Sequence, residues 1–479
     1  MKPKAADIVF FQQYAVPYFG ILSIHARMRK FGYEADVIID DLEDDFLTAL
    51  AKTHPKIIGI SLLSTEHKWL IKRTHQIKKA LPDTLILVGG IHAMFFPEEI
   101  LKECAVDLVC HSEGEDVIIE LLNAFKTSPK PDLSKIDGLG YLGLDGELIK
   151  TPLAKLPDFD LDEKEERELY FDRYPVLAKD KVYRFFSSRG CPYRCSFCYN
   201  ATIHDQFKDQ GTYIRQKSVD SFIAEIKRET LRSEIASIFF YDDLFTFNRK
   251  WLREFLPRYR DEIGIPFWCT TFASFMTDEI ADLLAEAGCQ TVSFGIETGN
   301  QELRRKVLKK PVSDTKIIAC AEMLHQRGIA IQTANMFCLP DETFADALRT
   351  IELNIEAKTD YAFCSLFLPI PKTELADYCT EKGYLARALT LDDMPESFLT
   401  ASLLNIPDKD KIRNVHRLAY FFIKWPWFFK IGKPLVGWTF LTPLFELIYL
   451  YGNLLRHCEE RGITILQALP YAWRMRKSF

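Results

Sequence analysis

Short apolar runs alternate with amphipathic segments over most of this chain of 479 residues, and this alternation constrains the fold more than any other feature. It occurs in two blocks, from residue 7 to about 125 and from 181 to 370. A strand followed by a crossover helix pairs in parallel with the next strand, so each block predicts a parallel sheet covered by helices. We therefore expect an α/β protein.

The first block predicts a doubly wound, Rossmann-like sheet. Its expected strands are Ile8–Phe11, Ala35–Ile39, Ile57–Ser61, Leu85–Val88 and Leu108–Cys110. Ligands of such sheets bind beyond the carboxyl ends of the strands, and glycines there let a flat ligand approach the backbone. The candidate binding residues in these loops are Ser61, Gly89, Gly90, His92, Glu113 and Gly114. A Gly-x-Gly-x-x-Gly fingerprint is missing after the first strand, which disfavours a dinucleotide.

The second block predicts a partial (β/α)₆ barrel, whose active groups lie at the C-terminal ends of the strands. Its six expected strands are Lys181–Ser187, Ser237–Tyr241, Pro266–Thr271, Thr291–Gly295, Ile329–Phe337 and Tyr361–Leu368. A hairpin at Gly138–Thr151, turning at Asp145-Gly146, separates the blocks. We expect domains at 1–135, 181–385 and 386–479, the last mostly helical, with a linker at 136–180.

Three cysteines, Cys191, Cys195 and Cys198, follow the first strand of the second block within eight residues. Cysteine thiolates hold iron–sulfur clusters, and a cubane cluster normally takes four, so three leave one iron open for another ligand. A structural zinc site is the alternative, but it needs a second pair of ligands. The sequence has no second Cys-x₂-Cys pair, and the other nine cysteines lie in apolar segments, as buried small hydrophobes do.

The spacing of these cysteines, with Phe197 before the last of them, resembles the signature of radical S-adenosylmethionine (radical SAM) enzymes. The resemblance implies a 4Fe-4S cluster whose open iron chelates S-adenosylmethionine and whose electron releases a 5′-deoxyadenosyl radical. Later segments resemble the family in the same order: Tyr241–Asp243, Gly295–Gly299, Leu339–Thr343 and Pro369–Glu374. It further implies that Asp242, Asp243 and Glu297 position the cofactor and that Gly299 allows close backbone approach. Helix capping is the alternative for the aspartates.

Two features of the second block complicate this assignment. Gln332 and Asn335 lie three residues apart on one expected strand, which gives them opposite faces unless the strand bulges. The family often has an arginine near the end of the third strand, where this chain has Thr271–Ser274. A direct contact to the cofactor carboxylate must then be missing or come from elsewhere.

The segments Val88–Ile100 and Asp107–Glu115 resemble the cobalamin-binding domain that precedes many radical SAM cores. The Asp-x-His-x-x-Gly motif of other cobalamin modules is missing, so the resemblance implies cobalamin without a histidine ligand on the lower face of cobalt. His92 is then a polar lining residue. A nucleotide-binding or purely structural domain is the alternative.

The last hundred residues contain two unusually apolar, aromatic stretches, Tyr420–Phe429 and Val436–Leu455. Prolines and charges interrupt both, so neither is typical of a spanning helix. Tryptophan and lysine beside an apolar helix favour contact with a membrane surface; burial against the barrel is the alternative. Twelve cysteines without a secretion signal favour the cytoplasm, including the inner face of its membrane, and a net charge of −6 disfavours nucleic acid.

These features together predict a cobalamin-dependent radical SAM enzyme. The chemistry we expect is methylation of an unactivated carbon in an apolar, lipid-like or natural-product-like small molecule, with flavodoxin or ferredoxin as electron donor. An oxidative cyclase or rearrangement enzyme of the tetrapyrrole-cyclase type is the alternative within the same fold. A cluster-bearing redox sensor without turnover is the alternative from another class.

Overall fold

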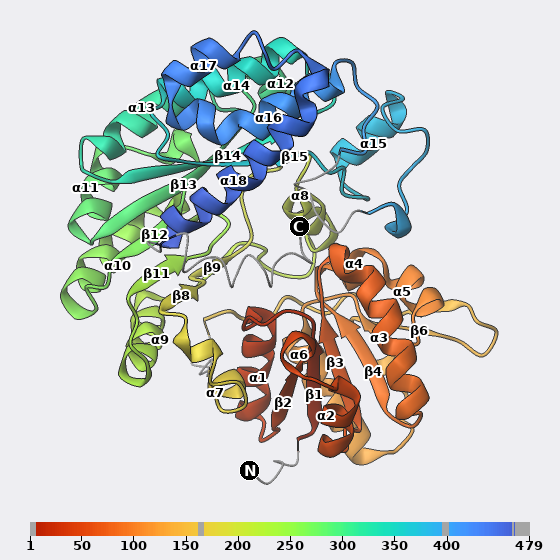
Figure 1. Ribbon diagram of the computed structural model, residues 1–479. Coiled ribbons are helices and arrows are strands. Elements are labelled where there is room, and N and C mark those ends of the chain that lie inside the picture. Colours follow the sequence, from red (N-terminus) through yellow and green to blue (C-terminus); the bar gives the residue numbers. More distant parts are fainter. Residues whose placement is uncertain (1–5, 161–166, 395–401, 462–463, 465–479) are drawn as a thin grey trace. The chain divides into compact units, whose positions relative to one another are not determined.

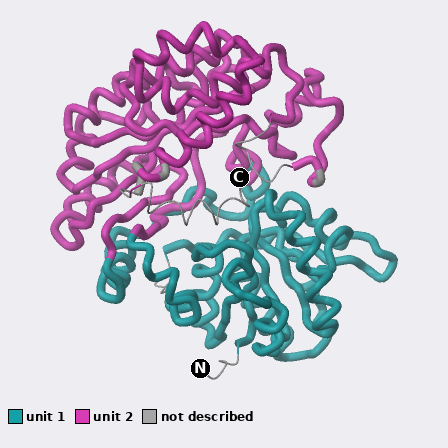
Figure 2. The backbone as a smooth tube through the Cα atoms, viewed as in Figure 1, with its two compact units in different colours: residues 1–181, 204–234 teal, residues 182–203, 235–479 magenta. Residues whose placement is uncertain are grey.

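The computed structural model describes residues 6–160, 167–394, 402–461 and 464. The chain divides into two compact units, shown in Figure 2. Unit 1 comprises Met1–Lys181 and His204–Glu234, and unit 2 comprises Val182–Ile203 and Ile235–Phe479. This division groups the residues that pack together. The domain boundaries expected at residues 135, 180 and 385 stay a prediction.

Unit 1 is built on a seven-stranded sheet in the order β2-β1-β3-β4-β5-β6-β7. The first five strands are parallel: β1 (Ile8–Gln12), β2 (Ala35–Ile39), β3 (Ile57–Ser61), β4 (Leu85–Gly89) and β5 (Leu108–Cys110). β6 (Leu139–Leu142) and β7 (Leu148–Lys150) pair antiparallel and are the predicted hairpin. The predicted parallel sheet is confirmed.

Helices cover both faces of this sheet, so alternate residues of its strands belong to two different apolar cores. Ile8 and Phe10 of β1 lie in one apolar cluster, and Val9 and Phe11 lie in another. The helices of unit 1 are α1 (Phe19–Lys30), α2 (Phe46–Thr53), α3 (His67–Ala80), α4 (Ile91–Phe95), α5 (Pro97–Glu103), α6 (Gly114–Thr127) and α7 (Glu168–Phe171), and α9 (Val219–Arg232) is grouped with them, but its described residues contribute to neither cluster. Burial on both faces is what makes these strands continuous apolar runs in the sequence.

Unit 2 is built on a six-stranded parallel sheet in the order β15-β14-β13-β12-β11-β8. Its strands are β8 (Val182–Phe185), β11 (Ser237–Phe240), β12 (Phe267–Thr270), β13 (Cys289–Glu297), β14 (Ala330–Phe337) and β15 (Tyr361–Leu366). The spatial order follows the chain order and β8 and β15 are the edges, which is the arrangement of an open barrel. All six predicted strands are confirmed. The two-residue strands β9 (Ser188–Arg189) and β10 (Arg215–Gln216) lie outside both large sheets.

Helices α10, α11, α13 and α14 line one face of this sheet (Figure 1). The helices of unit 2 are α10 (Arg249–Glu262), α11 (Asp278–Glu286), α12 (Gln301–Lys306), α13 (Asp314–His325), α14 (Phe344–Glu356), α15 (Glu374–Glu381), α16 (Lys409–Lys424), α17 (Pro426–Gly432) and α18 (Thr442–Arg461), and α8 (Tyr199–Gln206) begins in it. Several begin where a polar side chain caps the first turn, as Asn248, Thr277 and Ser313 do. Such caps fix where each crossover helix starts.

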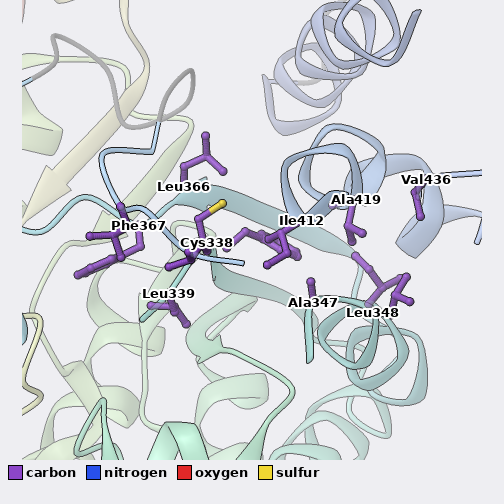
Figure 3. Packing of buried hydrophobic residues seen from close by; sticks show 14 of the residues in the cluster. Cys338, Leu339, Ala347, Leu348, Leu366, Phe367, Ile412, Ala419 and Val436 are labelled. Atoms are coloured by element: carbon purple, nitrogen blue, oxygen red, sulfur yellow. The ribbon is translucent and has the colours of Figure 1, made fainter. Parts of the chain in front are cut away.

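The helical tail packs one of its faces against the barrel. Ile412, Leu418 and Phe422 of α16 are buried in one cluster with Leu348 of α14 and Leu366 of β15. Figure 3 shows part of this cluster. The alternative expected for the aromatic tail, burial against the barrel, therefore holds for α16.

Candidate active site

The carboxyl ends of the strands in unit 2 surround a cavity of about 570 Å³. Cys191, Cys195 and Cys198 line it, together with residues from the strands or their ends: Tyr241, Thr271, Glu297, Gln332 and Phe363. These three cysteines and Cys364 are partly exposed, and the other eight are buried. Among the described residues, no three His, Cys, Asp or Glu side chains come close enough to enclose a single metal ion.

The backbone of the cysteine loop is held by hydrogen bonds through Ser196. Its amide donates to the Leu308 carbonyl at 3.1 Å, and its hydroxyl donates to the Val307 carbonyl at 2.6 Å. Its own carbonyl accepts from the Leu375 amide at 2.9 Å. α8 begins one residue after Cys198. The thiols therefore sit on a loop that is tied to two distant segments before any ligand binds.

Burial changes the protonation of these thiols. It raises the pKa of Cys191 to about 11 and that of Cys195 to about 12, and it also raises the pKa of Cys198. Without a metal, the thiols are therefore protonated at neutral pH. Thiolates are the ligands of iron, so metal binding here releases protons.

The segment after β12 holds an aromatic side chain of the cysteine loop. Tyr193 stacks on Phe272, with ring centroids 3.8 Å apart and planes 12° from parallel, and it packs edge-on against Phe275. Tyr193 also has a hydrogen bond with Ser274. At the place where the family resemblance predicts an arginine, this chain therefore has aromatic side chains that hold the cysteine loop through Tyr193.

The two aspartates that follow β11 lie in different surroundings. Asp242 is 2% exposed and accepts hydrogen bonds from the Ser187 amide at 3.2 Å, the Ser187 hydroxyl at 2.8 Å and the Ser188 hydroxyl at 2.5 Å. Asp243 instead lines the cavity, where Asn200 bonds to it and to Cys198. Burial raises the pKa of both carboxyl groups.

Helix capping does not account for these aspartates. The short 3₁₀ helix that follows them, Phe245–Phe247, has Leu244 as its N-cap, and no side chain caps this described helix with a hydrogen bond. Asp242 supports the turn after β8, and Asp243 is the member of the pair that a ligand in the cavity can reach.

Glu297, at the end of β13, forms an ion pair that sequence reasoning missed. Its carboxylate lies 2.7 Å from the Lys310 ammonium, which also lies over the Phe272 ring at 5.2 Å. Glu297 has a φ of 65°, a left-handed conformation that costs a non-glycine residue about 1 kcal/mol or more. A Cβ at Gly295 would collide with both members of the pair. No sequence motif links Lys310 to Glu297, because Lys310 lies in a loop beyond α12.

The remaining barrel candidates divide between the two faces of the sheet. A Cβ at Gly299 would collide with the backbone of Arg349, so the close approach this glycine permits is to α14. Gln332 lines the cavity and accepts a hydrogen bond from Ser293 at 2.7 Å. Asn335 is buried on the opposite face and accepts a hydrogen bond from Asn354 of α14 at 2.7 Å. The opposite pleat parity expected for Gln332 and Asn335 is confirmed.

The carboxyl edge of the sheet in unit 1 combines glycine with exposed apolar side chains. Gly90 has a φ of 87°, and a Cβ there would lie 2.9 Å from the Leu62 amide nitrogen and the Ser61 hydroxyl. Gly89 has more room, with Cys110 at 3.8 Å. In the nearby loops Leu63 is 59% exposed, and Tyr14 and Val16 are also exposed. Apolar rims with glycines behind them fit a large flat ligand such as a corrin ring.

His92 lies behind this edge, fully buried. Its Nε2 is 2.9 Å from Nδ1 of His67, and its Nδ1 is 3.2 Å from the Ser64 hydroxyl, so both ring nitrogens are engaged by the protein. Glu113 pairs with Arg215 at 3.0 Å, and Gly114 begins α6. Of the six unit 1 candidates, Ser61 and Gly89 end β3 and β4 and pair with each other, and Gly90 follows directly, so these three meet at the carboxyl ends of the two strands.

Comparisons with known proteins match both units. Residues 185–353 match the radical SAM superfamily, and residues 12–122 match the B12 binding domain. The chain is 27% identical to an uncharacterized methyltransferase of Pyrococcus horikoshii, over 77% of this chain and 80% of that one. It is 26% identical to the cytidylyl-2-hydroxyethylphosphonate methyltransferase of Streptomyces wedmorensis, over 76% and 78%. It is also 26% identical to the anaerobic magnesium-protoporphyrin IX monomethyl ester cyclase of Rubrivivax gelatinosus, over 71% and 61%.

The fold is similar to that of a solved structure. The radical SAM methyltransferase TsrM of Kitasatospora setae superimposes with a TM-score of 0.66 at 19% identity, covering 80% of this chain and 78% of that one. The cofactors predicted from the sequence, a 4Fe-4S cluster, S-adenosylmethionine and cobalamin, are those of the two matched families. The chain is a methyltransferase-like radical SAM enzyme with an N-terminal B12-binding domain.

Proposed function

We propose that this enzyme methylates an unactivated carbon of a small, largely apolar molecule. The observation that carries the proposal is the cavity of unit 2, which is lined by three cysteines, Asp243 and several aromatic side chains. When bound, the cluster and S-adenosylmethionine supply a carbon radical, and cobalamin supplies the methyl group. Aromatic side chains in the lining disfavour water beside the reacting atoms, and a drier site protects a radical from side reactions.

In this proposal the polar residues of the cavity have separate roles. Cys191, Cys195 and Cys198 hold the cluster as thiolates. Asp243 accepts a hydrogen bond from the ammonium group of S-adenosylmethionine, since it is the member of its pair that lines the cavity. Lys310 supplies a cation for the cofactor carboxylate, and Glu297 orients Lys310 through their buried ion pair.

The loops at the carboxyl edge of unit 1 hold cobalamin. Gly90 lets the loop after β4 pack closely against the loop after β3 at this edge, and the exposed side chain of Leu63 packs on the corrin ring. Ser61 offers a hydroxyl at the same edge. His92 supports the edge from behind through Ser64 and does not ligate cobalt, because its nitrogens are already hydrogen-bonded.

The cyclase relative supports a second candidate, an oxidative cyclase or rearrangement enzyme. It would use the same cluster and cavity but leave no new methyl group on its product. In either case the cluster needs single electrons, which flavodoxin or ferredoxin of the cytoplasm can supply.

The tail offers a surface for a membrane. Exposed apolar side chains follow one another along α17, the next turn and α18: Trp427, Ile431, Trp438, Phe440, Leu444, Leu447, Leu450 and Tyr451. Phe440 is 73% and Leu447 67% exposed, and Lys430 beside them is exposed as well. An apolar row with nearby cations favours the surface of an anionic bilayer. No helix in the described ranges combines the length and hydropathy that crossing a bilayer requires.

The proposed reaction is tested by anaerobic turnover of the reconstituted, cobalamin-loaded enzyme with S-[methyl-¹³C]adenosylmethionine and a metabolite extract. We expect about four irons per chain, release of 5′-deoxyadenosine, and a product that carries the label on carbon. Replacing Cys191, Cys195 and Cys198 with alanine should abolish all three, whereas Cys320→Ala, which removes a buried thiol in α13, should not. Deoxyadenosine with an unlabelled, oxidised product would favour the cyclase, and iron without deoxyadenosine would favour a sensor.

The two aspartates should separate in their effects. Asp242→Asn removes the charge that three serine donors share, so we expect a loss of about 1–3 kcal/mol in the free energy of unfolding of the apoprotein. Asp243→Asn should leave stability nearly unchanged but weaken S-adenosylmethionine binding about tenfold, as loss of a charge-assisted bond does. Urea unfolding and equilibrium dialysis measure the two quantities. Equal weakening of binding by both variants would contradict the assignment.

The cobalamin surface is tested with Leu63→Asp. A carboxylate in place of this exposed side chain should abolish retention of hydroxocobalamin through gel filtration without changing the iron content or the unfolding midpoint. Leu144→Asp, at a fully exposed leucine in the hairpin turn, is the matched control. Substitution at Gly90 is a poorer test, because a side chain there meets the neighbouring loop itself. Undiminished retention by Leu63→Asp would exclude this edge as the corrin surface.

Membrane contact is tested by sedimentation with phosphatidylglycerol vesicles. We expect reversible binding that weakens at high salt, because added ions screen the cationic attraction. Phe440→Asp with Leu447→Asp should abolish it, since each exposed apolar side chain contributes about 1.5–3 kcal/mol when buried. Leu231→Asp, at an exposed leucine of α9, should bind normally. Deleting 420–455 would be less informative, because Phe422 and Phe429 belong to the core.

A further inference from the structure

Lys310 places a buried positive charge in the wall of the cavity that the three cysteines line. Its side chain is 9% exposed, and its ammonium group lies 2.7 Å from the Glu297 carboxylate. The ammonium group also lies 5.2 Å from the centre of the Phe272 ring, which stacks on Tyr193 of the cysteine loop. Water screens a charge only weakly at such a buried place, so its field extends further than that of a surface lysine.

The loop that carries Lys310 also holds the cysteine loop. The carbonyls of Val307 and Leu308 accept hydrogen bonds from Ser196. Ser196 directly follows Cys195, and Lys310 follows Leu308 by two residues. One short segment therefore fixes the position of the cation relative to the thiols.

The fully buried Arg304 of α12 holds this loop together. Its carbonyl accepts a hydrogen bond from the Lys310 amide at 2.9 Å, and its guanidinium donates to the Val312 carbonyl at 2.7 Å. The guanidinium also donates to the Thr298 carbonyl at 2.9 Å, just after the end of β13, and pairs with Asp314 at 2.7 Å. Arg304 therefore ties the loop of Lys310 to the end of the strand that carries its carboxylate partner.

At Cys195 the effect of Lys310 is larger than that of Glu297. Burial is the main reason that the pKa of this thiol is raised; Lys310 opposes the rise, and Glu297 adds to it by a smaller amount. At Cys191 burial again raises the pKa, Asp243 adds to the rise and Lys310 opposes it. Seen from Cys195, the ion pair therefore acts as a positive charge.

We propose that Lys310 raises the reduction potential of the cluster held by the three cysteines, with Arg304 as its positioning residue. Reduction adds one electron, and a fixed cation stabilises the added negative charge. Net charge close to an iron–sulfur cluster is one of the means by which a protein sets its potential. The inference goes beyond the proposed function, because the cluster must be reduced before either methylation or cyclisation.

The experiment is a potentiometric titration of the reconstituted enzyme, followed by electron paramagnetic resonance of the reduced cluster, with titanium(III) citrate as the source of electrons. It is made without S-adenosylmethionine, so that the role of Lys310 in binding that cofactor does not enter. Lys310→Met should make the midpoint potential more negative, whether or not Glu297 then takes up a proton, because the dominant positive charge is lost in both cases. Lys310→Arg keeps the charge and should stay close to the wild type.

Lys309→Met is the matched control. Lys309 lies in the same loop, but it is 51% exposed and pairs with the exposed Glu374. Water screens a charge at such a place, so its loss should leave the midpoint potential unchanged. All variants should bind about four irons per chain, because the hydrogen bonds that hold the cysteine loop come from the backbone of Val307 and Leu308.

Glu297→Gln is an independent arm, and it decides the outcome if Lys310→Met fails to assemble a cluster. Removal of the negative partner should make the midpoint potential less negative. An unchanged or oppositely shifted midpoint in Lys310→Met or Glu297→Gln would overturn the inference. Equal shifts in Lys310→Met and in either Lys310→Arg or Lys309→Met would overturn it as well. None of these results bears on the methylation proposal, which depends on the labelled product.

Discussion

Parallel strand pairing is the constraint on which the catalytic unit depends. Six strands that run in one direction bring their carboxyl ends to one edge, so loops far apart in the sequence share a single cavity. Cys191 after β8 and Phe363 on β15 line the same space. The hydrogen bonds of Ser196 and the stacking of Tyr193 on Phe272 then hold the cysteine loop over that edge.

Within the cavity, buried hydrogen bonds separate supporting residues from residues that can meet a ligand. Asp242 has its oxygens occupied by two serines, whereas its neighbour Asp243 faces the open space. His92 in unit 1 is engaged at both nitrogens. A polar residue in the right loop is therefore a candidate ligand only if its neighbours leave its polar atoms accessible.

The helical tail combines three structural features in one segment. α16 completes the barrel core, α18 carries an exposed apolar row, and Arg456 near its end reaches the cavity. The apolar composition of the tail thus reflects a core face and a surface face together.

The sequence by itself determined the strands of both sheets, the hairpin and the cysteine loop, because alternation, turn residues and thiol spacing are local properties of the chain. For Gln332 and Asn335 the spacing predicted opposite faces only if the strand did not bulge, and the structure places them on opposite faces. Tertiary structure decided which of Asp242 and Asp243 lines the cavity, that Lys310 pairs with Glu297, and that Arg456 enters from the tail. Each of these depends on side chains that meet only after distant segments pack, and no local pattern records such a meeting.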